Sequence, residues 1–151
     1  MNIIKERYCQ KYSNLRGGSD MRIIQFRGKS KKTGEWLYGF YLQNRGVDFI
    51  CPDEFADGKS WEDYEVTPDT IGQFTGLYDK YDEGIYEGDI IKSRGEGDKI
   101  IYHYIKWQES PAAFVARLFG IPKRWDGRSL TQSWLSEFEK EVCGNIYDTR
   151  I

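Results

Sequence analysis

The run Ile100-Ile-Tyr-His-Tyr-Ile-Lys-Trp107 alternates β-branched and aromatic residues, a pattern typical of a β-strand. A second apolar run, Ala112–Leu118, follows the turn residues Gln108-Glu-Ser-Pro111, so the two runs predict a hairpin. Ser110 and Pro111 also suit the N-cap and first position of a helix. Local chemistry leaves that alternative open.

Shorter strands are predicted on both sides of this hairpin, separated by glycine-containing turns. They are Ile23–Arg27, Glu35–Gln43, Val47–Cys51, Ile85–Lys92 and Val142–Tyr147. Many short strands favour a mainly β fold, a β-barrel that is SH3-like in part, with α+β as the alternative. One helix is predicted in the C-terminal region. There Ser129-Leu-Thr-Gln132 matches a capping box. The apolar residues Leu130, Trp134, Leu135 and Phe138 follow on one face.

The 151 residues suit one domain, and an aromatic share of 16% argues against disorder despite 30% charged residues. No membrane-length apolar run or secretory leader is visible, so we expect a cytoplasmic protein. Residues 1–20 differ from the rest and end in turn-forming residues. Two interpretations stay open for them: an extension that precedes a native start at Met21, or a true N-terminal arm of the 21–151 domain.

The net charge of −2 conceals three blocks of different sign. Residues 1–45 hold ten basic and three acidic residues, residues 46–91 hold two and thirteen, and residues 92–151 hold ten and eight. Blocks of one sign can steer charged partners. The simpler expectation is that the basic N-terminal hairpin packs beside the acidic middle segment and that their charges partly cancel.

Neither a metal, a cofactor nor a catalytic residue is predicted. Cys9, Cys51 and Cys143 lie far apart, and His103 is the single histidine, so a zinc site is not indicated. The carboxylates of the 79–89 region do not follow the calcium-loop pattern and are expected to be solvated turn residues; they are Asp79, Asp82, Glu83, Glu87 and Asp89.

Five separated blocks resemble the YopX-like proteins, a family of small phage and prophage products, over Met21 to Ile151. The most specific block is Gly84-Ile-Tyr-Glu-Gly-Asp-Ile-Ile91; the others are Ile23–Arg27 with Trp36–Gly39, Ile71–Lys80, Lys106–Leu118 and Glu141–Tyr147. The resemblance implies a mostly β, barrel-containing fold, favours a strand at Ala112–Leu118 and implies a phage or prophage origin. It implies no activity. The acidic stretch Pro52–Glu65 and the segment Phe119–Lys140 depart from the family pattern.

Three functions from different classes are consistent with these observations. The first is a non-enzymatic binding or regulatory module for a host or phage protein. Its anchors would be exposed aromatic rings, unless these rings are buried in the core; the candidates are Trp61, Tyr78, Tyr81 and Trp125. The second is a nucleic-acid-binding barrel using the basic hairpin, with Arg22, Arg27, Lys29, Lys31, Lys32 and Arg45, joined by Lys123, Arg124 and Arg128. The third is an enzyme that uses acids or the histidine: Asp79, Glu87, Asp89 and His103. An overall pI near 5.5 argues against dedicated nucleic-acid binding.

Overall fold

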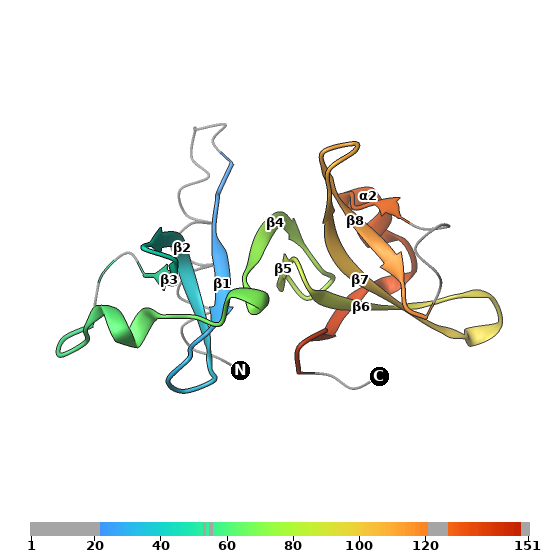
Figure 1. The fold of residues 1–151 in the computed structure, drawn as a ribbon. Coiled ribbons are helices and arrows are strands. Elements are labelled where there is room, and N and C mark those ends of the chain that lie inside the picture. Colours follow the sequence, from blue (N-terminus) through green and yellow to red (C-terminus); the bar gives the residue numbers. More distant parts are fainter. Residues whose placement is uncertain (1–21, 53, 55, 121–126, 149–151) are drawn as a thin grey trace. The chain divides into compact units, whose positions relative to one another are not determined.

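The computed structural model describes residues 22–52, 54, 56–120 and 127–148 (Figure 1). Predictions for residues 1–20, Met21, Lys123, Arg124 and Trp125 therefore lie outside the described residues. Within the span expected as one domain, the chain forms two compact units, which meet in sequence between Phe74 and Thr75. We call them unit 1 and unit 2. The boundary falls within strand β4, Gly72–Tyr78.

Unit 1 is built on three antiparallel strands, β1 (Phe26–Lys29), β2 (Trp36–Asn44) and β3 (Val47–Cys51). In the register, Gly28 pairs with Leu37 and Leu42 with Phe49. The start of β4 pairs with β1, and β5 (Gly84–Tyr86) follows β4 in the strand order β3-β2-β1-β4-β5. The expected strands Ile23–Arg27 and Glu35–Gln43 form as the hairpin β1–β2, although β1 begins three residues later than predicted, at Phe26, and extends to Lys29.

The core of unit 1 lies where β1 and β3 meet the segment after β3. Ile50 and Val66 are fully buried, and a Cβ added at Gly28 would lie 3.1 Å from Val66. Glycine at position 28 therefore allows the strand and the Val66 segment to approach closely. Two 3₁₀ turns, Trp61–Tyr64 and Pro68–Thr70, complete this segment. Its Tyr64 side chain is buried.

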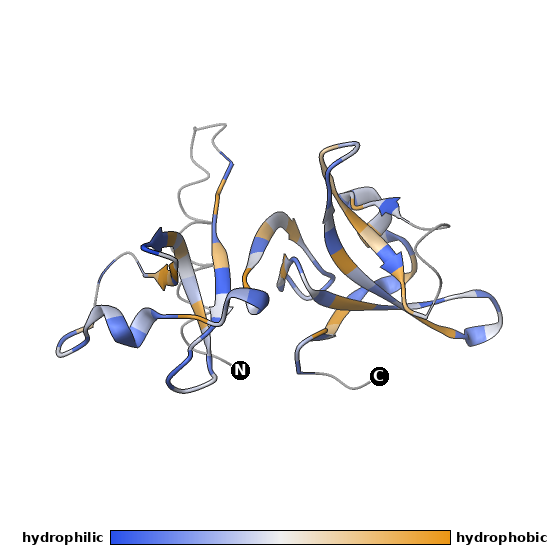
Figure 2. Cartoon of the chain, in the orientation of Figure 1, coloured by the Kyte–Doolittle hydropathy of each residue, from blue (hydrophilic) through white to orange (hydrophobic). Residues whose placement is uncertain are grey.

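Unit 2 holds the second sheet, with strand order β10-β6-β7-β8-β9, and the short strand β5 (Figure 1). The remaining strand bounds are β5 Gly84–Tyr86, β6 Asp89–Arg94, β7 Ile100–Gln108, β8 Ala113–Leu118, β9 Arg128–Ser129 and β10 Glu141–Asn145. The predicted β7–β8 hairpin is confirmed, with Ile105 opposite Ala116, and Ser110-Pro111 begins no helix. Isoleucines from β5, β6 and β7 form the core with Trp134 and Leu135. Figure 2 shows apolar residues concentrated along the strands and hydrophilic residues at the turns.

The predicted helix forms as α2, Gln132–Ser136, but its cap differs from the prediction. Thr131 is the N-cap, and its hydroxyl accepts a hydrogen bond from the Trp134 backbone N–H at 3.1 Å. Ser129 lies in β9 because its backbone pairs with Val115. Phe138 is 69% exposed, with a φ of 56° in the 3₁₀ turn Glu137–Glu139, so it does not continue the buried face.

The most specific sequence block, Gly84–Ile91, forms a buried corner between β5 and β6. The Asp89 carboxylate accepts the Tyr86 backbone N–H at 2.8 Å, and Asp89 is 1% exposed. Gly88 has a φ of 86°, and a Cβ there would lie 2.8 Å from the Tyr147 ring. This block is therefore a structural corner that only glycine fits at its tightest point.

The expectation of a mainly β fold with one C-terminal-region helix is confirmed for the described residues. Both sheets are open, so the expected barrel is not closed within these residues. At one edge of the second sheet, β9 has only two residues, too few to continue the ladder to a further strand. Within the described ranges, no helix has the length and apolar character needed to span a membrane.

Candidate functional site

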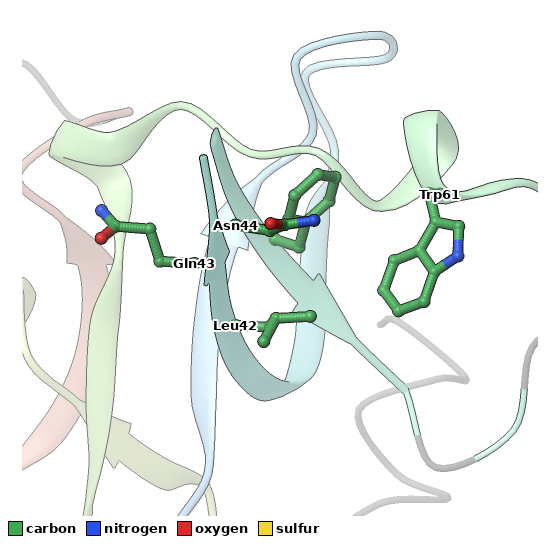
Figure 3. Close-up of a pocket in the computed structure, with 5 residues that line it drawn as sticks. Leu42, Gln43, Asn44 and Trp61 are labelled. Carbon is green, nitrogen blue, oxygen red and sulfur yellow. The ribbon is translucent and has the colours of Figure 1, made fainter. Parts of the chain in front are cut away.

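An apolar groove of about 540 Å³ lies on unit 1, on the face of β2 and β3 that carries Leu42 and Phe49. Trp61 forms its other wall, with its ring edge-on to Phe49 at a centroid separation of 5.9 Å. Figure 3 shows Leu42 and Trp61 on the same side of β2, while Gln43 extends from the opposite side. Leu42 is 41% and Trp61 is 52% exposed. We call this feature the Trp61 groove.

The groove arises because β2 carries apolar side chains on both of its faces. Alternate residues of a strand point to opposite faces, so Phe40 and Leu42 share the face of the groove. Phe40 is 52% exposed. On the other face, Tyr41 donates a hydrogen bond to Asp48 at 2.6 Å, which raises the pKa of the tyrosine. Sequence reasoning missed Phe40, Leu42 and Phe49, although large apolar residues at both parities of one strand signal two apolar faces.

Charged residues of both signs flank the groove in sequence, with exposed Arg45 next to Asn44 and exposed Glu62 next to Trp61. The Lys32 ammonium lies 2.7 Å from the Asp63 carboxylate, and Lys31 pairs with Glu65. Lys32 holds the pKa of Asp63 down at about 2. These pairs confirm that the basic hairpin packs beside the acidic segment. Three exposed acids near Trp61 in sequence have no ion pair within the described part of the chain: Glu54, Asp57 and Glu62.

The predicted aromatic anchors occupy different environments. Trp61 lines the groove, whereas Tyr78 is half-buried in unit 2. Tyr81 is 70% exposed, and the Lys80 ammonium lies 4.8 Å from the centre of its ring. Trp125 lies outside the described residues. The structure therefore places Trp61, of these four, in an apolar hollow.

The basic residues predicted for nucleic acid do not form a uniformly free surface. Arg27 is 3% exposed, and its guanidinium lies 4.6 Å from the centre of the Trp36 ring. Lys29 packs on the same ring at 5.6 Å and is half-buried. Lys31 and Lys32 are paired with acids, as described above. Arg22 and Arg45 are exposed.

Two of the acids expected to be solvated are buried, which corrects that prediction. Asp79 is 5% exposed and accepts backbone N–H groups of Tyr81, Glu83 and Val142 at 2.8–2.9 Å. Asp89 closes the corner at β6. The local sequence could not indicate the burial of Asp79, because its Val142 donor lies 63 residues away. These carboxylates order turns by accepting backbone donors.

The remaining candidates do not assemble a catalytic pair. Glu87 accepts the Trp107 backbone N–H at 3.1 Å. His103 is 8% exposed and packs edge-on against Trp134. Burial, followed by the charges of Lys140 and Arg128, lowers the pKa of His103 to about 4. A general base oriented by a carboxylate needs the opposite electrostatics, because a nearby negative charge stabilises imidazolium.

Clusters that could hold a metal are absent from the described residues. Cys51 is half-buried and Cys143 is exposed, and both are free thiols. Burial raises the pKa of each thiol, which makes the reactive thiolate scarcer. Cys9 lies outside the described residues.

Comparisons with known proteins agree with this geometry. The family model described as YopX protein matches residues 25–150. The crystal structure of protein EF1440 from Enterococcus faecalis is similar, with 21% sequence identity and a TM-score of 0.51. The match covers 83% of this chain and 94% of that chain, and at this identity it shows the fold alone. None of the curated proteins matches the chain. The family match covers both units and confirms the resemblance drawn from the five sequence blocks: the chain belongs to the YopX family.

Proposed function

We propose that this protein is a non-enzymatic binding module of a phage or prophage, acting in the bacterial cytoplasm on a protein partner through the Trp61 groove. The observation that supports it is the grouping of exposed Leu42 and Trp61 around one hollow of about 540 Å³. Tryptophan is among the residues that contribute most to protein interfaces. Exposed apolar surface of this kind marks interaction sites more often than chance.

The chemistry of the groove indicates the kind of protein segment that it binds. Its walls are apolar, so the partner inserts an aliphatic or aromatic side chain. Glu62 follows Trp61 directly and has no ion pair within the residues described. A partner with lysine or arginine beside its apolar residue would complement this charge.

Nucleic-acid binding by the basic hairpin is the weaker alternative. A groove that follows a nucleic-acid backbone needs lysine or arginine side chains that are available to neutralise phosphates, because this releases the counterions bound to the nucleic acid. In unit 1, Arg27 is buried, and Lys31 and Lys32 already pair with carboxylates. Little of the hairpin's positive charge is therefore available to bind phosphates.

The test is affinity capture from the native host with the wild-type protein and two single-ring variants. Trp61→Ser removes the groove wall, and Tyr81→Ser is the matched control because Tyr81 is an even more exposed ring and lies in unit 2. We expect a defined protein to be retained after nuclease treatment by the wild type and by Tyr81→Ser, and lost with Trp61→Ser. Purified partner should then bind the Trp61 variant at least tenfold more weakly, as is usual for a central interface residue.

Two results would contradict the proposal. Equal capture by all three proteins would show that the groove does not bind the partner. Capture that disappears on nuclease digestion would favour the nucleic-acid alternative. Far-UV circular dichroism of each variant confirms that the fold is intact.

A further inference from the structure

A second hollow, of about 420 Å³, lies wholly within unit 2 and is independent of the Trp61 groove. Its walls come from the end of β6 and the connection that follows, from β7, from the end of β8, from β9, and from α2 with the segment after it. Trp134 and Phe138 supply aromatic surface, and His103, Arg128 and Lys140 supply nitrogen atoms. We call it the Lys140 pocket.

Lys140 is an unusual residue to find at the bottom of such a pocket. It is 3% exposed, and its ammonium lies 4.5 Å from the centre of the Trp134 ring and 5.4 Å from that of Phe138. The ammonium donates one hydrogen bond, to the backbone oxygen of Glu137. An ammonium has three N–H donors. No carboxylate of the described residues lies within 4 Å of this one.

His103 lines the same pocket and is also incompletely satisfied. Its Nδ1 atom is shielded from solvent and has no hydrogen-bond partner within the described ranges. Buried polar atoms without partners are rare in folded proteins, and each one calls for an explanation. Because Nδ1 is shielded, a ligand in the pocket would reach it only after a shift of the imidazole ring, so this atom supports a ligand site only together with the buried Lys140 ammonium.

Arg128 lines the same pocket as His103 and Lys140. Burial is the main cause that lowers the pKa of both groups, and the positive charge of Arg128 lowers each further, so His103 is held neutral beside two cations. Arg128 itself is exposed and forms no ion pair with the described residues. The other charged residues lining the pocket are Arg94, which pairs with Asp98 at 3.7 Å, and the exposed acids Glu96 and Glu137. Glu137 partly offsets the charge of Lys140, and neither acid forms an ion pair with it.

We propose that the Lys140 pocket binds the phosphate group of a small organic phosphate, with Lys140 and Arg128 as its cationic partners and His103 as a further donor. The three groups come from separate elements and converge, which suits the three terminal oxygens of a phosphate better than a planar carboxylate. A volume of about 420 Å³ exceeds that of one phosphate group. The organic part of the ligand would lie against Trp134 and Phe138.

Binding can be followed on His103, since it is the only histidine in the sequence. Its imidazole Cε1–H signal in ¹H–¹³C NMR spectra of the full chain is therefore unambiguous. The probes are phenyl phosphate and inorganic phosphate, each titrated at pH 7 against sodium chloride of matched ionic strength. We expect a saturable shift with both phosphates, none with chloride, and tighter binding of phenyl phosphate because its ring contacts the aromatic wall.

Three variants separate this site from general charge attraction. Arg128→Gln and Lys140→Met should each weaken phenyl phosphate binding about tenfold, because each removes a charge-assisted hydrogen bond. Lys106→Gln is the matched control, since Lys106 is an exposed lysine of unit 2 that lies outside the pocket. It should bind like the wild type. Arg128 is exposed, so its variant keeps the test valid even if Lys140→Met misfolds.

The proposal fails if phenyl phosphate gives no saturable shift up to about 10 mM. It also fails if Arg128→Gln binds like the wild type, or if Lys106→Gln loses affinity to the same extent. Equal affinity for phenyl phosphate and inorganic phosphate would show that the aromatic wall does not contact the ligand. The proposed organic phosphate would then be wrong, and the pocket would bind a free oxyanion. None of these outcomes bears on the Trp61 groove, so this inference and the proposed function are tested separately.

Discussion

Unit 2 buries two acids and two bases to a similar extent but satisfies them in opposite ways. Asp79 and Asp89 are 5% and 1% exposed, and His103 and Lys140 are 8% and 3% exposed. The acids accept backbone N–H groups, three of them in the case of Asp79. The bases face each other and Arg128, and the Nδ1 atom of His103 has no partner within the described ranges.

The difference separates two reasons for burying a polar group. A carboxylate that accepts several backbone donors orders the chain and contributes to folding, because each donor would otherwise be unsatisfied. A buried ammonium without a carboxylate partner, such as that of Lys140, gains no such compensation and reduces stability. Burial of the second kind points to a ligand, and the following predictions test the distinction in order of decreasing effect.

The largest effect is expected for Asp79→Asn. The amide presents N–H groups to part of a site that holds only donors, so we expect the free energy of unfolding to fall by about 3 kcal/mol. Urea unfolding followed by tryptophan fluorescence measures this loss. The matched control is Asp98→Asn, because Asp98 is 89% exposed at the side chain and its pair with Arg94 is a surface contact. A loss below about 1 kcal/mol for Asp79→Asn would show that its hydrogen bonds do not order the fold.

The next effect is a pH dependence that comes from His103. Its pKa of about 4 in the folded state lies below the usual value of 6.5, so the unfolded state binds more protons between these pH values. The stability contributed by neutral His103 is therefore present above pH 6.5 and lost as the pH falls towards 4. Relative to His103→Phe, the wild type should lose about 2 kcal/mol over this window. Parallel stability curves for the two proteins would contradict it.

A smaller effect of opposite sign is expected for Lys140→Met. Methionine keeps the unbranched stem but removes a buried charge that lacks a carboxylate partner, so stability should stay unchanged or rise by about 1 kcal/mol. Thermal unfolding at low phosphate concentration gives the measurement. A loss above about 2 kcal/mol would place Lys140 with Asp79 as a residue that holds the fold.

The smallest effect is expected at the half-buried pair of Lys92 and Glu141, whose charged atoms lie 2.6 Å apart. Glu141 keeps a second partner, the Lys80 ammonium at 2.9 Å, and ion pairs near the surface contribute little to stability. Lys92→Met should leave the urea midpoint unchanged within error, in 0.1 M and in 1 M sodium chloride alike. A salt-dependent loss would show that surface charges, and not burial alone, set the balance in unit 2.

The sequence predicted most of the strands because their signals are local. Alternation in Ile100–Trp107 and the turn before Glu35 lie within single segments, and the structure has hairpins at both. The cap of α2 was misplaced by two residues because Ser129 and Thr131 offer the same hydroxyl chemistry. Strand pairing of Ser129 with Val115 decides between them, and that pairing is not local.

The candidate sites were predicted less well than the fold. Trp61 was predicted as an aromatic anchor for a partner. Its neighbours Leu42 and Phe49 were not, because in the sequence they resemble ordinary strand residues. His103 was predicted on one strand face, and nothing near it in sequence indicates Arg128 or Lys140. Both sites depend on which distant segments meet, whereas periodicity reports only which face a residue occupies.

The contact between Gly88 and Tyr147 links two separate blocks of the family's sequence pattern. A Cβ at position 88 would lie 2.8 Å from the Tyr147 ring, and the Gly88 oxygen accepts the Ile146 backbone N–H. The φ of 86° favours glycine at position 88 whatever residue stands at position 147. Among YopX proteins, the glycine should therefore persist even in relatives that carry a smaller residue in place of Tyr147. The dependence runs one way: the ring requires the glycine, whereas the glycine does not require the ring.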